Sequence, residues 1–156
     1  MSRGGAWARA GLVTGLVVAV DQVTKKLARD GIRPGEEDPI LPALKLVNVR
    51  NEGVAFGIDA GGKTLVIALI ALALLALVLY FARHTARPLI WLPTGLLLGG
   101  ALGNIVDRIR DGAVTDFLKI PAWPAFNVAD IAITIGVLAL VLVLERRDED
   151  RGRPGG

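Results

Sequence analysis

Long apolar runs separated by short polar connections dominate this chain. A helix needs about 20 largely apolar residues to cross the hydrocarbon core of a bilayer. On that measure the pattern predicts four spans, at about residues 7–28, 64–82, 88–106 and 127–144. We therefore expect an all-α integral membrane protein, with residues 1–144 forming one domain of four transmembrane helices.

The connections between these spans differ in character. Residues 29–63 hold the alternating run "ALKLVNVRNEGVAFGI", which predicts short strands around a turn at "NEG" and hence a small extramembrane β element. Residues 83–87 form a tight basic turn, and residues 107–126 form a polar connection. Residues 145–156 are charged and rich in Gly and Pro, so we expect a disordered tail.

Span parity brings several polar residues to one face. Four spans place the connections 29–63 and 107–126 on the same side, with both termini on the other. Asp21 lies 14 residues after Trp7, or ~21 Å along the helix, close to that side. The third span ends there, and the fourth begins there. The polar residues that converge at this depth are Asp21, Asn104, Asp107, Asn127 and Asp130.

Composition supports a membrane protein and excludes other classes. The 156 residues are 53% hydrophobic and 5% aromatic, with a mean hydropathy of +0.53, which is too apolar for an ordinary soluble domain. The net charge of +3 comes from basic residues that flank the apolar runs, so we expect a membrane surface and no nucleic acid as partner. Lys and Arg flank the spans on both sides, so their count does not orient the chain.

Structural roles compete with functional ones for the residues of the first and third spans. Asp21 can mark the water interface, with Lys25 and Lys26 snorkelling outward. Asn104 and Asp107 lie three residues apart on one helical face and can form an interhelical hydrogen-bond cluster. Considered singly, each pattern fits a structural role as well as a chemical one.

The same holds for the residues near the fourth span. Asn127 can be a helix N-cap, with Asp130 favoured in the first turn by the helix dipole. Asp116 can be an ordinary loop carboxylate. The lone His84 lies in the basic turn on the opposite face, where we expect it to be solvated.

Taken together, these residues favour a catalytic site, because ionisable residues in membrane spans are costly and usually functional. The chain has no cysteine and no HExxH pattern, and no histidine on the polar face, so Ser-His chemistry is excluded there and zinc is not expected. Two carboxylates held close together share a proton and can activate water. An ion-coupled transporter subunit and a purely structural membrane protein are the alternatives, although no span carries a charge at mid-depth.

Four sequence blocks, in order along the four spans, resemble the lipoprotein signal peptidases, the bacterial signal peptidase II family. They are "DQVTK" at 21–25, "NEGVAFG" at 51–57, "GNIVDRIRDGAVTDF" at 103–117 and "FNVADIAITIG" at 126–136. The resemblance implies that Asp116 and Asp130 form a catalytic dyad. It further implies that the following residues line or brace the site: Asp21, Asn51, Gly53, Asn104, Asp107, Arg108 and Asn127.

The resemblance also implies an activity and a location. The expected activity is an intramembrane aspartyl endopeptidase that cleaves diacylglyceryl-modified prolipoproteins just before the lipidated cysteine, with no metal or other cofactor. The expected location is the bacterial inner membrane, with cytoplasmic termini and the site near the outer leaflet. We expect a monomer in contact with membrane lipid. Ile131 stands where the family often has a small residue, and the tail lies outside the shared blocks.

Overall fold

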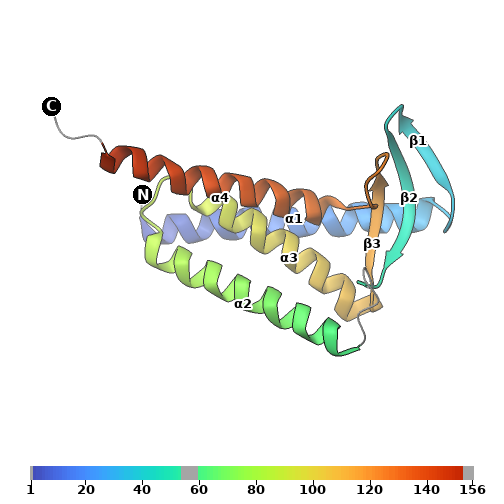
Figure 1. The fold of residues 1–156 in the computed structure, drawn as a ribbon, viewed down its shortest axis with the longest axis horizontal. Helices are drawn as coiled ribbons and strands as arrows, with labels where there is room; N and C mark the ends of the chain where they lie inside the picture. Colours follow the sequence, from blue (N-terminus) through green and yellow to red (C-terminus); the bar gives the residue numbers. More distant parts are fainter. Residues whose placement is uncertain (1, 54–59, 153–156) are drawn as a thin grey trace.

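The computed structural model describes residues 2–53 and 60–152, with side chains described for 2–53 and 68–145. The helices run lengthwise, and a small sheet lies across one end of them (Figure 1). The start of α1 and the last described turns of α4 lie at the opposite end (Figure 1). The elements in chain order are α1 (Arg3–Gly31), β1 (Glu37–Leu41), β2 (Leu44–Asn51), α2 (Ala60–His84), α3 (Trp91–Asp111), β3 (Val114–Lys119) and α4 (Val128–Gly152).

Each predicted span coincides with most of one helix. By length and apolar composition, two helices within the described residues could cross a membrane, namely α1 and the Val128–Glu145 part of α4. The described apolar part of α2, Ala68–His84, is shorter. The structure differs from the expected disordered tail, because α4 continues to Gly152. Residues 145–151 contain neither Gly nor Pro, so nothing in them breaks the helix, and residues 153–156 lie outside the described residues.

Glycines spaced four residues apart allow α3 to lie very close to α1. A Cβ added to Gly99 would lie 2.6 Å from the Val17 Cβ, and one added to Gly103 would lie 2.5 Å from Asp21 Oδ2. Small residues permit this approach in helices that pack within a membrane. The neighbouring Gly100 does the same for α4, since its added Cβ would lie 2.5 Å from the Ala129 carbonyl oxygen. The ends of α1, α3 and α4 near the sheet are therefore tightly joined.

The sheet has the antiparallel order β1-β2-β3. A strand in the first long connection was predicted and is confirmed as β2, but its hairpin partner is β1, with the turn at residues 42–43. The predicted turn at "NEG" does not join these strands, and residues 54–57 lie outside the described residues.

The third strand comes from residues 107–126, where only a polar connection was expected. Its sequence "VTDFLK" is rich in β-branched and aromatic residues, which favour a strand once a partner edge is available. The β2 edge supplies that partner, with Val49 opposite Asp116 and Asn51 opposite Val114. Asp116 therefore lies on a hydrogen-bonded strand and not in an irregular loop.

Candidate active site

The two predicted catalytic aspartates come from different kinds of element. Asp116 lies on β3 and is 3% exposed, whereas Asp130 lies in the first turn of α4 and is half-buried. The segment between them doubles back on β3, because Leu118 N–H donates to the Phe126 carbonyl (2.9 Å) and Phe126 N–H donates to the Leu118 carbonyl (2.8 Å). This closed loop brings the start of α4 beside the strand.

Asn127 links both aspartates. Its Nδ2 donates to Asp116 Oδ1 at 2.7 Å, and its Oδ1 accepts from the Asp130 N–H at 3.0 Å. The Asn127 N–H in turn donates to Asp130 Oδ2 at 3.2 Å, which completes a reciprocal capping box at the start of α4. The predicted N-cap is therefore confirmed, and the same side chain also holds Asp116.

Asn104 joins this pair from α3. Its Nδ2 donates to Asp130 Oδ1 at 2.9 Å, and its Oδ1 accepts from Asn127 Nδ2 at 3.2 Å. Asp130 thus has one carboxylate oxygen on Asn104 and the other on the Asn127 backbone. Both oxygens of the half-buried carboxylate are held in place.

Asn51 holds the other side of Asp116. Its Nδ2 donates to Asp116 Oδ2 at 2.9 Å, and its Oδ1 accepts from the Gly53 N–H at 2.9 Å. Gly53 has a φ of 75°, in the left-handed region that glycine adopts without steric penalty, and this lets its N–H turn back to Asn51. Gly53 thus acts on the site through Asn51.

The environment of Asp116 favours its protonated form. Burial raises the pKa of this carboxyl most strongly, and the nearby Asp130 raises it further. The amide donors of Asn51 and Asn127 lower the pKa, but the balance leaves it above its ordinary value. Such a pair of carboxyls can hold one proton between them and so offer an acid beside a base.

Asp21 and Asp107 converge on a cation that the sequence did not place in the site. Lys25 Nζ lies 2.8 Å from Asp21 Oδ2 and 3.0 Å from Asp107 Oδ2, and all three side chains are fully buried. The alternative in which Lys25 snorkels outward is therefore contradicted, whereas Lys26 is 70% exposed and paired with Asp30. The (i, i+4) spacing of Asp21 and Lys25 was the available signal, because it puts both on one face of a helix.

Arg108 is not brought to the aspartates. It is half-buried, and its guanidinium donates to the Asn104 carbonyl one turn back in α3, at 3.2 Å. Gln22, which was not predicted as a site residue, contacts this region instead. Its Nε2 donates to Asp107 Oδ1 at 2.9 Å and to the Gly103 carbonyl at 3.2 Å.

Two hollows each include one of the aspartates and part of the 120–126 loop in their lining. One, of about 420 Å³, is lined by Val49, Arg50, Asn51, Glu52, Asp116, Pro124 and Ala125, of which four have polar or charged side chains. The other, of about 290 Å³, is mainly apolar and is lined by Ile120, Trp123, Phe126, Asp130, Ile131, Thr134 and Ile135. Each carboxyl therefore borders a hollow of its own.

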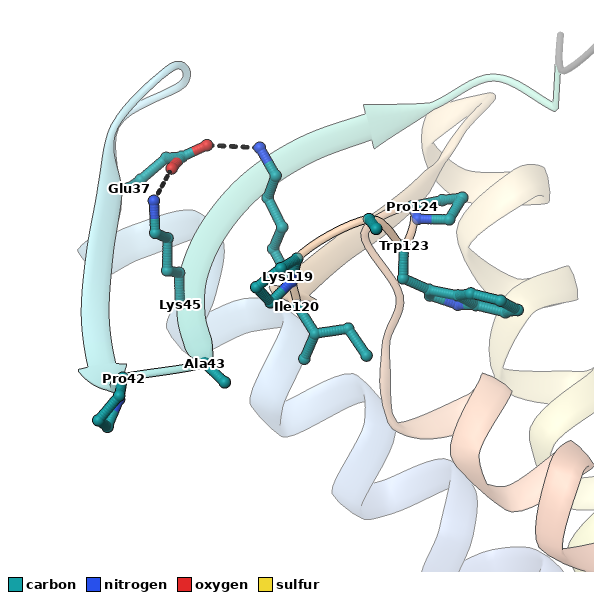
Figure 2. A pocket seen from close by; sticks show the side chains of 10 residues that line it. Glu37, Pro42, Ala43, Lys45, Lys119, Ile120, Trp123 and Pro124 are labelled. Atoms are coloured by element: carbon teal, nitrogen blue, oxygen red, sulfur yellow. Dashed lines mark hydrogen bonds and ion pairs between the residues drawn. The ribbon is translucent and has the colours of Figure 1, made fainter.

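A third hollow, of about 480 Å³, lies between the sheet and the same loop. Figure 2 shows Glu37 reaching toward both Lys45 and Lys119, with Trp123 at the far side. The hydrogen bond from Lys119 (2.5 Å), and next that from Lys45 (2.7 Å), lower the pKa of Glu37 to about 2. This exposed cluster joins the three strands and leaves one positive charge in excess. Within the described residues, no group of three or more His, Cys, Asp or Glu is arranged to hold a metal ion.

Comparisons with known proteins identify the family. Residues 13–145 match the family described as signal peptidase (SPase) II. The lipoprotein signal peptidase of Halothermothrix orenii is 37% identical over 88% of this chain and 96% of its own, and that of Moorella thermoacetica is 41% identical over 88% and 93%. A solved structure described as a bacterial membrane enzyme is 31% identical, with a TM-score of 0.82 over 94% of this chain and 93% of that one. The chain therefore belongs to the signal peptidase II family, peptidases that remove signal peptides from prolipoproteins.

Proposed function

We propose that this chain is an intramembrane aspartyl endopeptidase in which Asp116 and Asp130 activate water. It cleaves diacylglyceryl-modified prolipoproteins at the peptide bond just before the lipidated cysteine. The observation that carries the proposal is the double contact of Asn127, which bonds Asp116 through its amide and Asp130 through its backbone and side chain. A carboxyl pair held in this way is suited to acid–base catalysis.

The two carboxyls take different roles. Asp116, whose pKa is raised by burial, supplies the proton, and the half-buried Asp130 acts as the base. Asp130 takes a proton from water as the water oxygen attacks the scissile carbonyl carbon, while Asp116 gives its proton to the carbonyl oxygen. The tetrahedral diol then collapses: the C–N bond breaks, Asp130 passes its proton to the leaving amine, and Asp116 takes back a hydroxyl proton.

A membrane location is supported by the apolar outer surface of the helices. Side chains such as Leu72 on α2, Leu16 on α1 and Leu138 on α4 are 60% or more exposed, and contiguous exposed apolar surface marks a membrane or partner contact. All four helices cross the bacterial inner membrane, with both termini in the cytoplasm and the sheet at the outer face. The apolar hollow beside Asp130 then opens toward the acyl chains of a substrate arriving from the bilayer. That the enzyme is a monomer stays a prediction.

The test is a cleavage assay in detergent. Purified protein is incubated with a diacylglyceryl-modified precursor and, separately, with the unlipidated precursor, both in the presence of a chelator. We expect a shortened product only from the lipidated precursor. Asp116→Asn and Asp130→Asn should each abolish cleavage while the protein still purifies as a folded species. Substantial activity in either variant would refute the dyad, and loss of activity with chelator would refute metal-free chemistry.

A further inference from the structure

A fully buried lysine lies directly behind the two aspartates without touching either. We propose that Lys25 is a positioning residue that fixes the two catalytic carboxyls relative to each other, an inference that rests on the proposed function. Its ammonium group has three N–H donors and no acceptor. The three side chains that meet it are Asp21 (2.8 Å), Asn104 (2.9 Å) and Asp107 (3.0 Å). Each of them also hydrogen-bonds either to a catalytic aspartate or to the residue immediately before one.

The first connection runs to Asp130. Asp21 accepts from Lys25 through Oδ2 and from the backbone N–H of Ala129 through Oδ1, at 2.9 Å. Ala129 is the residue immediately before Asp130 and is fully buried. Because the Ala129 N–H is one of the donors left free at the start of a helix, Asp21 pins the first turn of α4 from a different helix.

The second connection runs to Asp116. Asp107 Oδ2 accepts from Lys25 and also from the backbone N–H of Thr115 at 3.2 Å. Thr115 is the residue immediately before Asp116, and its hydroxyl accepts from Arg29 at 2.9 Å. The start of β3 is thus held to α3 and α1, as the start of α4 is held to α1.

The third connection sets the direction of an amide. Because the lysine only donates, the contact with Asn104 requires that the amide oxygen faces Lys25. The Asn104 amide nitrogen must then face Asp130, to which it donates at 2.9 Å. Asn127 Nδ2 donates to the same amide oxygen at 3.2 Å, so removing the lysine would leave this longer bond as the remaining donor contact that keeps the Asn104 oxygen turned away from Asp130.

Charge burial by itself does not explain this arrangement. Buried ion pairs can often be replaced by apolar residues of similar volume without loss of stability. An apolar replacement cannot hydrogen-bond to the carboxylates that hold β3, which carries Asp116, and α4, which carries Asp130. The symmetry of the two carboxylates, each bonded to the residue before a catalytic aspartate, therefore favours positioning over stabilisation.

The experiment compares three variants with the parent enzyme. Lys25→Met removes the ammonium but leaves two buried carboxylates, so it is paired with the neutral triple variant Asp21→Asn/Lys25→Met/Asp107→Asn. The new amides can still accept from the Ala129 and Thr115 N–H groups. Lys26→Met is the matched control, because Lys26 is the adjacent residue and is exposed. The melting temperature of each variant is measured first. The kcat, the KM and the pH profile of kcat are then measured at a temperature below the lowest of these melting temperatures.

We expect kcat to fall about 100-fold in Lys25→Met, as a displacement of ~1 Å at a reacting group can cause. The triple variant should recover the melting temperature but not kcat, with KM changed less than threefold and the pH profile of kcat displaced. Lys26→Met should match the parent. Recovery of kcat in the triple variant would overturn the proposal, because Lys25 would then only neutralise charge. Failure of the triple variant to fold would also overturn it, by assigning Lys25 to the fold. If the parent cleaves but Asp116→Asn cleaves equally well, the proposed function fails instead.

Discussion

Replacing Asn127 separates the two roles that this residue combines. As an N-cap it accepts from the Asp130 N–H, and as a bridge it donates to Asp116. Asn127→Ala removes both contacts. Asn127→Ser keeps a short side-chain oxygen at the N-cap, where serine is as favourable as asparagine, but removes the amide that donates to Asp116. The pair of variants therefore tests the bridge apart from the cap.

The expected magnitudes follow from the two contacts. Losing a cap costs ~1 kcal/mol of stability, which lowers the melting temperature of a chain of this length by about 2–4 °C. In the proposed mechanism Asp116 becomes ionised as it gives up its proton, so the bond from Asn127 strengthens from a neutral one to a charge-assisted one. That difference is about 1–2 kcal/mol, or roughly 5- to 30-fold in kcat.

The assay is turnover at saturating lipidated precursor, measured beside the melting temperature for each variant. Asn127→Ala should lose both rate and stability. Asn127→Ser should regain most of the stability and still turn over roughly 5- to 30-fold slower than the parent. An Asn127→Ser enzyme with parental kcat would make this residue a cap and nothing more.

Three other perturbations test the remaining features. Burial raises the pKa of Asp116, so between the unfolded and the folded pKa the folded protein keeps a proton that the unfolded chain releases. The free energy of unfolding should therefore fall as pH rises from about 3.9 to the raised pKa. Melting temperatures measured across this pH range should fall less in Asp116→Asn than in the parent. Gly103→Ala places a Cβ 2.5 Å from Asp21 Oδ2 and should cost about 1–3 kcal/mol with a loss of kcat, whereas Gly11→Ala, with open space around it, should do neither. In a chain without native cysteines, Arg33→Cys should react with an impermeant thiol reagent in intact cells and Ala86→Cys should not; reversed labelling would contradict the proposed orientation.

The sequence predicted the long elements well, because each leaves a long signal. Apolar runs of about 20 residues are typical of membrane spans, and the four helices overlap all four predicted spans. The spacing of Asn127 and Asp130 predicted a capped helix start, which the structure confirms. The resemblance to signal peptidase II, confirmed by the comparisons, rested on four blocks in order and not on any single motif.

The parts that could not be predicted depend on partners distant in the chain. The strand β3 is six residues long and forms only because β2 offers it an edge. Lys25 lies near the end of the predicted span 7–28, close to the interface, where a lysine ordinarily reaches water. Two of its three partners, Asn104 and Asp107, come from α3, and close approach of α1 and α3 at the glycines decides that it stays buried.

The contacts behind the aspartates join the beginning of the chain to its end. Asp21 and Ala129 are separated by 108 positions, and Gln22 and Asp107 by 85. During synthesis α1 is made first and α4 last. In the proposed membrane topology, the acidic and basic groups of α1 therefore enter the bilayer before most of their final partners have been made. The second aspartate reaches its place only when translation is nearly complete. A chain that stops before α4 thus lacks Asp130, and with it the proposed catalytic pair.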